Sequence, residues 1–266
     1  MIAIIGDAFV DRYHLGTVRG LSAEAPIPIV DVKCEKEFAG GAANVQANLE
    51  AMGAQTVLIN SKQPTLGSDR WRVPIKNRLM AGDTQLARWD TEDWLPPIQV
   101  EELLPVVDAD AVIVCDYGKG SITSELIEIL KLGEWPLFVD TKANPKDWIG
   151  ADNCTLFPNL KEYSQFKETY DWLPQVVLKQ GADGATILQY GRPVHKEVAK
   201  SGEVRSVNGA GDTVIAAYTD WIVGAGGSPA EALRWSMAAA AAVVSKPYTS
   251  TVTLEEIHGF LGSGGV

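Results

Sequence analysis

Five short apolar runs, each followed closely by a polar residue, constrain the fold of this chain more than any other feature. Runs that are apolar throughout predict strands buried on both faces, and the amphipathic or Ala-rich stretches between them predict helices. This alternation predicts an α/β fold with a mostly parallel central sheet and helices on both faces. The carboxyl ends of such strands form the edge where open α/β sheets bind ligands. The runs cover residues 2–5, 111–115, 136–139, 154–157 and 176–178, and they lead to Asp7, Asp116, Asp140, Asn159 and Lys179.

A second, smaller sheet is predicted by a different pattern. Residues 27–38 alternate apolar and polar side chains, and residues 77–80 and 85–89 are spaced to form a hairpin. We therefore expect one domain over residues 1–266, with strands of a projecting lid inserted at about 14–38 and 75–90. Because the alternating segment would leave an apolar stripe exposed in a monomer, it predicts a homodimer formed through the lid strands.

Composition excludes several classes of function. The 23 Lys and Arg against 34 Asp and Glu give the 266 residues a net charge of −11, which argues against a nucleic-acid-binding surface. The three histidines have no metal-ligand spacing, and the three cysteines are dispersed, as in proteins of a reducing compartment. No apolar run approaches the ~20 residues that span a bilayer. We expect a soluble, cytoplasmic protein that binds neither nucleic acid nor membrane.

The strongest local motif is Asn208-Gly-Ala-Gly-Asp-Thr213, directly before an apolar helix. The small residues Gly209, Ala210 and Gly211 would let a ligand approach the backbone, and the helix N-terminus favours a phosphate. Asp212 in the first turn could accept a proton from an attacking hydroxyl. The bare motif is equally compatible with a turn at Gly211 and an ordinary N-terminal carboxylate.

A second glycine motif, Gly40-Gly-Ala-Ala-Asn44, leaves a similar choice between a tight turn and a binding turn. In the binding interpretation Asn44 hydrogen-bonds sugar hydroxyls, and Asp7 and Asp11 could accept from vicinal hydroxyls. The Walker A, Rossmann GxGxxG, HExxH and GxSxG motifs are all absent from the sequence. An enzyme that handles phosphate must therefore use another scaffold.

Together, the two glycine motifs resemble the two signatures of the PfkB, or ribokinase-like, carbohydrate kinases. Further segments are similar to the heptose-7-phosphate kinase branch of that family, and the resemblance runs from residue 2 to about residue 256. Signatures in the correct order with several matches between them are more specific than either signature alone. The further segments are Gly6-Asp-Ala-Phe-Val-Asp-Arg-Tyr13, Ser22-Ala-Glu-Ala-Pro-Ile-Pro-Ile-Val30, Cys115-Asp-Tyr-Gly-Lys-Gly120, Asp140-Thr-Lys142 and Phe157-Pro-Asn-Leu-Lys-Glu162.

The resemblance implies a Rossmann-type three-layer body with a β lid and an ATP-dependent sugar kinase activity. The implied acceptor is the anomeric hydroxyl of a heptose 7-phosphate, and the implied cofactors are ATP and Mg²⁺, with a monovalent cation such as K⁺ also compatible. Asp212 matches the catalytic base, and Gly209, Ala210 and Gly211 match the anion hole. The remaining implied roles are nucleotide binding by Asn159, Lys179, Gly181 and Gly184, indirect Mg²⁺ positioning through water or phosphate by Asn159 and Glu162, sugar binding by Asp11, Gly40, Gly41 and Asn44, and sugar-phosphate contacts by Arg88 and Lys119.

The sequence departs from that branch in ways that keep two alternatives open. The 19 residues between Leu58 and Arg78 are fewer than the branch leads us to expect, and Gly20 stands where the branch carries an arginine. We expect the shortened stretch to lie at the sheet periphery, away from Asp212. The first alternative is a kinase for another sugar or a nucleoside. The second is a catalytically weak sugar- or nucleotide-binding protein, which would not need to retain Asp212.

Overall fold

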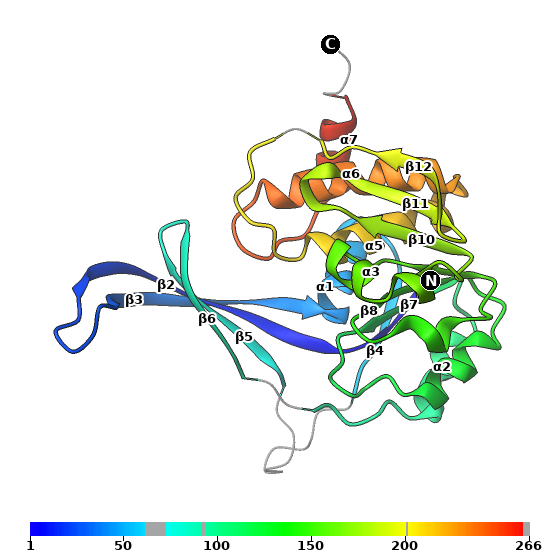
Figure 1. Cartoon of the computed structure of the whole chain (residues 1–266), viewed down its shortest axis with the longest axis horizontal. Helices are drawn as coiled ribbons and strands as arrows, with labels where there is room; N and C mark the ends of the chain where they lie inside the picture. The colour runs from blue at the N-terminus through cyan, green and yellow to red at the C-terminus, as the bar shows by residue number, and fades with distance from the viewer. Residues whose placement is uncertain (62–72, 92–93, 201, 263–266) are drawn as a thin grey trace.

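The structure, a computed structural model, describes residues 1–61, 73–91, 94–200 and 202–262. It contains an eight-stranded body sheet and a four-stranded lid sheet that extends away from the body (Figure 1). The α/β fold class and the projecting lid predicted from the sequence are thereby confirmed. No helix in the described ranges is long and apolar enough to cross a membrane.

The body sheet has the order β12-β11-β10-β9-β8-β7-β1-β4 and is parallel from β10 to β4. All the predicted apolar strands form. β12, at the opposite edge to β4, was not predicted, because its sequence RPVHKE is mostly polar. The strands are β1 (Ile2–Gly6), β4 (Thr56–Ile59), β7 (Ala111–Asp116), β8 (Leu137–Thr141), β9 (Cys154–Leu156), β10 (Gln175–Lys179), β11 (Ala185–Gln189) and β12 (Arg192–Glu197).

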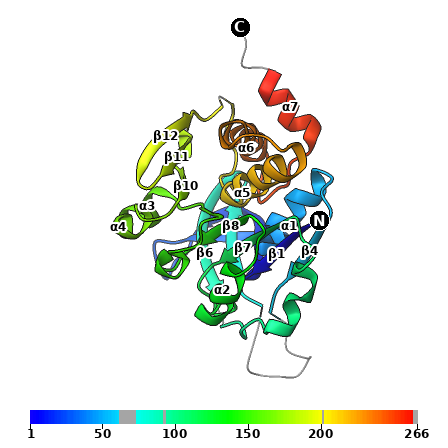
Figure 2. The same cartoon turned by 90° about the vertical axis from the view of Figure 1, so that its right-hand side faces the viewer.

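Helices cover both faces of the body sheet (Figure 2). Strand alternation divides the core: Ile2 and Ile4 of β1 pack with α1, α5, α6 and α7, whereas Ala3 and Ile5 pack with α2 and the segments beside it. The central strands are thus buried on both sides, as their continuous apolar runs require. The helices are α1 (Ala42–Ala51), α2 (Ser124–Lys131), α3 (Leu160–Gln165), α4 (Lys167–Tyr170), α5 (Ala210–Asp220), α6 (Pro229–Val244) and α7 (Leu254–Gly262).

The lid sheet has the order β3-β2-β5-β6. Its strands are β2 (Ala8–Leu21), β3 (Pro28–Gly41), β5 (Ile75–Ala81) and β6 (Thr84–Thr91). The predicted β5–β6 hairpin forms, but β2 starts six residues earlier than the expected lid boundary at residue 14. The lid therefore grows directly out of β1, with Asp7 between the two strands, and its first residues lie beside the carboxyl edge of the body sheet.

One face of the lid sheet packs towards the body. Across β2, β5 and β6, Asp11 lies opposite Lys76, and Lys76 lies opposite Asp90. In the same way, Tyr13 lies opposite Arg78, and Arg78 lies opposite Arg88. Paired residues and residues two apart share a face, so all six side chains lie on one side of the lid. The Tyr13 hydroxyl lies 3.1 Å from Thr249 Oγ1, and Asn208 Nδ2 donates to it at 3.0 Å, which identifies this side as the body-facing one.

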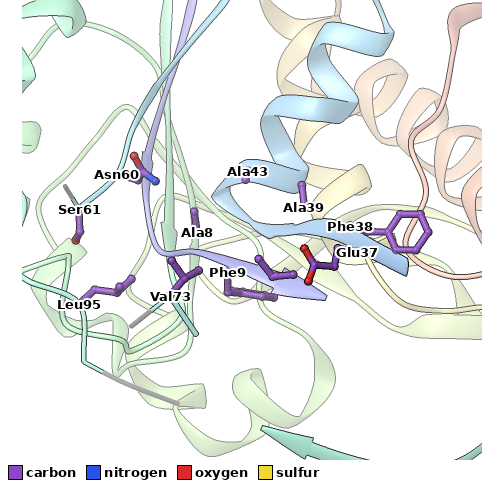
Figure 3. Close-up of a pocket in the computed structure, with 11 residues that line it drawn as sticks. Ala8, Phe9, Glu37, Phe38, Ala39, Ala43, Asn60, Ser61, Val73 and Leu95 are labelled. Atoms are coloured by element: carbon purple, nitrogen blue, oxygen red, sulfur yellow. The ribbon is translucent and has the colours of Figure 1, made fainter. Parts of the chain in front are cut away.

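The described residues next to β4 and β5 border a pocket of about 380 Å³ beside the lid strands (Figure 3). Asn60, Ser61 and Val73 line it together with Phe9 and Leu95, and Asp212 is not among the lining residues. β4 itself is the edge strand of the body sheet. Because residues 62–72 lie outside the described ranges, the expectation that the whole stretch is peripheral stays a prediction.

Candidate active site

Asp212 lies in the first turn of α5 and is buried. Both oxygens of its carboxylate have a donor: Asn44 Nδ2 donates to Oδ2 at 2.8 Å, and the Tyr117 hydroxyl donates to Oδ1. Burial raises the pKa of Asp212 above its ordinary value, while the hydrogen bonds from Asn44 and Tyr117 act in the opposite direction. A carboxylate held in this way keeps a fixed orientation and a basicity above that of an exposed aspartate.

The two glycine motifs meet at Asp212. Gly209 caps α5 with a left-handed φ of 78°, and a Cβ there would come 2.8 Å from Asn44 Nδ2. Gly41 caps α1 with a φ of 60°, and a Cβ there would lie 2.4 Å from the Asp7 carbonyl oxygen. Asn44 can therefore approach the start of α5 because Gly209 has no side chain there, while Gly41 lets α1 start close against the Asp7 carbonyl.

Asp7 lies below the site instead of facing a ligand. Its Oδ2 accepts from the backbone N–H groups of Tyr117 at 2.8 Å and Lys119 at 3.0 Å, and its Oδ1 accepts from Ser121. The side chain is fully buried, which leaves no exposed oxygen for a sugar hydroxyl. This corrects the expectation that Asp7 binds sugar: it fixes the loop after β7 and so positions Tyr117.

The other side of α5 carries a compact group of charges. Asp140, at the end of β8, accepts from Lys142 and from Lys179, both at 2.7 Å. These two ammonium groups outweigh burial and hold the pKa of Asp140 at about 2, so it is ionised at any working pH. A Cβ on Gly211 would lie 3.4 Å from Lys179 Nζ, so this cation stands beside the α5 N-terminus.

Asn159 and Glu162 form the N-terminal cap of α3. Asn159 Oδ1 accepts from the Glu162 N–H at 2.9 Å, and Glu162 Oε2 accepts from the Asn159 N–H at 2.8 Å. Glu162 Oε1 also pairs with Lys142 at 2.9 Å. Because both Glu162 oxygens are engaged, this pair fits an indirect contact to Mg²⁺ through water or phosphate better than direct ligation. Among the described residues, no group of three or more His, Cys, Asp or Glu side chains is arranged to hold a metal.

The turn after β10 contains the two remaining predicted nucleotide-side glycines. Gly181 has a φ of 61° with open space around its Cα, whereas Gly184 has a φ of 87° and a Cβ there would lie 2.0 Å from the Glu197 carbonyl oxygen. Gly184 is thus required by packing against β12. Gly181 faces open space, which is compatible with a ligand approaching the turn at the end of β10, beside Lys179.

The lid contributes cations that sequence reasoning did not single out. Arg78 Nη1 donates to Asp11 Oδ1 at 2.6 Å, and both side chains are buried. Thr249 Oγ1 donates to the other oxygen of Asp11 at 3.1 Å. Lys76 lies beside this pair with its Nζ 3.5 Å from the centre of the Phe9 ring. The sequence signal for these cations was the spacing of Lys76 and Arg78, which lie two residues apart and therefore on one face of β5. Which residue of β5 lies opposite Asp11 depends on the strand register, however, and the sequence does not give that register.

The sequence also left Tyr117 without a role, although it lies in the Cys115–Gly120 segment that carries the resemblance. Arg88 lies on the lid face, where its guanidinium makes two bonds to Asp90 at 2.8 and 2.6 Å, and its contact to a sugar phosphate stays a prediction. Lys119 reaches the site through its backbone N–H to Asp7. The structure therefore assembles a buried carboxylate at the start of α5, a lysine beside the same helix N-terminus, and a lid face that carries several cations.

Comparison with known families places this arrangement in a class. The model for the pfkB family carbohydrate kinase matches residues 111–257, more than half of the chain. The chain belongs to this family, whose members are phosphotransferases that act on an alcohol group. ATP is the phosphoryl donor of ribokinase-like kinases.

Individual relatives agree with this assignment. The chain is 31% identical over 312 residues to the bifunctional protein HldE of Hyphomonas neptunium, covering 99% of this chain and 64% of that protein. It is also 31% identical over 306 residues to HldE of Nitrosococcus oceani, covering 97% of this chain and 63% of that protein. The chain thus spans somewhat less than two thirds of the length of these relatives.

Solved structures support the fold. Phosphofructokinase-2 from Escherichia coli, in complex with substrates and products, matches with a TM-score of 0.78 at 15% identity, covering 99% of this chain and 98% of that one. Ribokinase from Arabidopsis thaliana, complexed with ribose and ATP, matches with a TM-score of 0.71 at 20% identity, covering 98% of each chain. At these identities the likeness is evidence for the fold alone.

Proposed function

We propose that this carbohydrate kinase transfers the γ-phosphoryl group of ATP to a hydroxyl of a phosphorylated sugar, and that this hydroxyl is the anomeric one of a heptose 7-phosphate. The observation that carries the proposal is the position of Asp212. It is buried and doubly hydrogen-bonded at the start of α5, with Lys179 beside the same helix N-terminus.

In this mechanism Asp212 accepts the proton of the attacking hydroxyl. As the new bond from the sugar oxygen to the γ-phosphorus forms, the bond from that phosphorus to the bridging oxygen breaks, and ADP leaves with the electron pair. The N–H groups at residues 209–211 and the Lys179 ammonium would stabilise the charge on the transferring group. Because these donors are fixed by the fold, they need no reorganisation during the transfer.

Mg²⁺, when bound together with ATP, would neutralise part of the phosphate charge. Asn159 and Glu162 would reach it through water or phosphate, since their own atoms are engaged in the α3 cap. Lys142 joins this cap to Asp140, with 2.9 Å to Glu162 and 2.7 Å to Asp140. The cap and the lysine pair are therefore one connected unit on the nucleotide side.

Two observations favour a phosphorylated acceptor. The relatives that match along nearly the whole chain are named HldE, and the resemblance stated above implies a heptose-7-phosphate kinase for this half of such proteins. In a chain of net charge −11, the lid face nevertheless gathers Lys76, Arg78 and Arg88 against the two carboxylates Asp11 and Asp90. A basic face in an acidic protein is the environment that a sugar phosphate requires.

A phosphotransfer screen tests this function. Wild-type protein with ATP and Mg²⁺ is offered heptose 7-phosphate, the unphosphorylated heptose, fructose 6-phosphate, ribose and adenosine, and ADP release is measured. We expect the highest kcat/KM for heptose 7-phosphate. Preference for ribose or adenosine would contradict the substrate class but keep the kinase, whereas sugar binding without ADP release would identify a binding protein.

The lid is also proposed to pair two copies of the chain. On its outer face and along the β2–β3 hairpin, Val18, Val32 and Trp89 are about half exposed, and Leu21 and Ile27 at the hairpin tip are more so. A stripe of this kind on a projecting sheet favours association with a second copy. The body-facing side of the lid would stay available for substrate in such a dimer.

A further inference from the structure

Lys76 is in an unusual environment for a lysine. It lies in the middle of the body-facing side of the lid, and its ammonium group rests over the ring of Phe9 at 3.5 Å and over that of Tyr117 at 5.2 Å. No carboxylate among the described residues forms an ion pair with it, in contrast to Lys142 and Lys179 on the nucleotide side. Lys76 is thus a partly buried cation that rests on aromatic faces and has no ion-pair partner among these residues.

The charged groups around Lys76 identify which kind of anion it could take. Asp11 and Asp212 attract its charge, and Arg78 and Arg88 repel it. Asp11 is already neutralised by Arg78, with 2.6 Å between the Arg78 Nη1 and the Asp11 carboxylate. Arg88 is likewise held by Asp90, at 2.8 and 2.6 Å. An additional dianion at this place would therefore meet two cations that already have carboxylate partners, and one cation, Lys76, that has no ion pair among the described residues.

We propose that Lys76 binds the phosphate group that the acceptor sugar already carries, on the lid side of Asp212. This inference rests on the proposed function and adds the residue that makes the enzyme select a phosphorylated acceptor. The acceptor phosphate is favoured over the transferring phosphoryl group because Lys76, Arg78 and Arg88 all belong to the lid, where Lys76 is the strand partner of Asp11.

The protonation of Lys76 gives the inference a signature in pH. Burial lowers the pKa of Lys76 to about 8, so its charge is lost in the unliganded enzyme as the pH rises through that value. A phosphate monoester is a dianion at this pH, since its second pKa is about 6. The KM for the phosphorylated acceptor should therefore rise above pH 8, whereas an arginine at this position should stay charged and abolish that rise.

The test compares the variants Lys76→Met and Lys76→Arg with the wild-type protein, using heptose 7-phosphate and the unphosphorylated heptose as acceptors. Lys36→Met is the matched control, because Lys36 also lies on the lid over an aromatic ring, 5.1 Å from the Tyr248 centroid, but is exposed. KM and kcat are measured for each acceptor and for ATP between pH 6.5 and 9.5, a range set about the Lys76 pKa of about 8.

If Lys76 holds the acceptor phosphate, Lys76→Met raises the KM for heptose 7-phosphate by at least about thirtyfold, or ~2 kcal/mol at 1.4 kcal/mol per tenfold. The KM for ATP and the KM for unphosphorylated heptose stay within about twofold of wild type, as do all constants of Lys36→Met. Lys76→Arg retains most of the affinity for the phosphorylated acceptor and loses the rise above pH 8. It also tests the inference if Lys76→Met does not fold.

Three results would overturn the inference, each for a different reason. If the wild-type protein phosphorylates heptose 7-phosphate and Lys76→Met has the same KM for it, Lys76 is excluded as the residue that binds the acceptor phosphate, and the proposed function is unaffected. A fall in kcat that is equal for both acceptors would show that Lys76 interacts with the transferring phosphoryl group instead of the acceptor phosphate. Failure of the wild-type protein to use any phosphorylated sugar would overturn the proposed function, and this inference with it.

Discussion

Replacing Tyr117 with phenylalanine isolates one hydrogen bond to the proposed base. The Tyr117 hydroxyl donates to Oδ1 of Asp212, while Asn44 holds Oδ2 at 2.8 Å. The aromatic ring also carries Lys76 and Lys142 over its surface, each 5.2 Å from the centroid, and phenylalanine keeps that ring. The variant therefore removes the donor to the carboxylate and leaves both cation–π contacts and the packing in place.

The expected size of the effect follows from the kind of bond that is lost. A hydrogen bond to an ionised group contributes about 1.5–3 kcal/mol, and one pKa unit corresponds to about 1.4 kcal/mol. Because the Tyr117 hydroxyl lowers the pKa of Asp212 against the effect of burial, its loss should raise that pKa further. The base must be deprotonated to act, so the acid limb of the pH profile of kcat/KM should move upward by the same amount.

The assay is the initial rate of ADP release against pH under conditions that report kcat/KM for the acceptor. At low pH Tyr117→Phe should be about 10- to 100-fold slower than wild type, and the two profiles should converge at high pH. Tyr163→Phe is the control, because the Tyr163 hydroxyl donates to Asp171 at 2.8 Å on α3, outside the site. An acid limb that stays in place in Tyr117→Phe would refute the claim that this tyrosine tunes the base.

Three further outcomes can be measured on stability and assembly. Asp140→Asn should lower the free energy of unfolding in urea by about 3–5 kcal/mol, because it leaves Lys142 and Lys179 beside a neutral amide in a buried site; a loss below about 1 kcal/mol would contradict the importance of this pair. Val32→Glu should give a monomer by sedimentation at concentrations where the wild-type protein is a dimer, and a monomeric wild-type protein would contradict the lid interface. The pKa of Lys76 is about 8 in the folded protein and 10.5 when unperturbed, so unfolding takes up a proton at pH values between the two. As the pH rises across that interval, the wild-type protein should therefore gain at most about 3 kcal/mol of stability relative to Lys76→Met. Parallel curves of stability against pH for the two proteins would refute the burial of this charge.

Much of the body fold could be predicted from the sequence, because burial on both faces leaves a continuous apolar signal in each central strand. The strands β1, β7 and β8 have this signal and form where expected. β12 lacks it, since an edge strand has one partner and its side chains remain partly in water. The start of β2 was missed for another reason: the chain passes from one sheet to the other at Asp7, without a turn signal.

The centre of the site was also predictable in part. Asn44 and Asp212 stand in glycine motifs that mark helix starts, and the structure brings these two helix starts within a hydrogen bond. Tyr117, Lys76 and Arg78 could not be assigned in this way, because their placement depends on the register between β2 and β5 and on the loop held by Asp7. Register is set by pairing across the whole sheet, which a local motif does not contain.

Turnover of the Asp212→Asn variant tests the central claim most directly. Asparagine keeps the size of the side chain and the start of α5 but cannot accept a proton from the attacking hydroxyl. If Asp212 is the base, turnover should fall by ~10²–10⁴-fold, equal to about 3–5 kcal/mol in the barrier, while ATP affinity stays unchanged or rises slightly. Near-normal turnover with unchanged ATP affinity would contradict the mechanism and reduce Asp212 to an ordinary helix-terminal carboxylate.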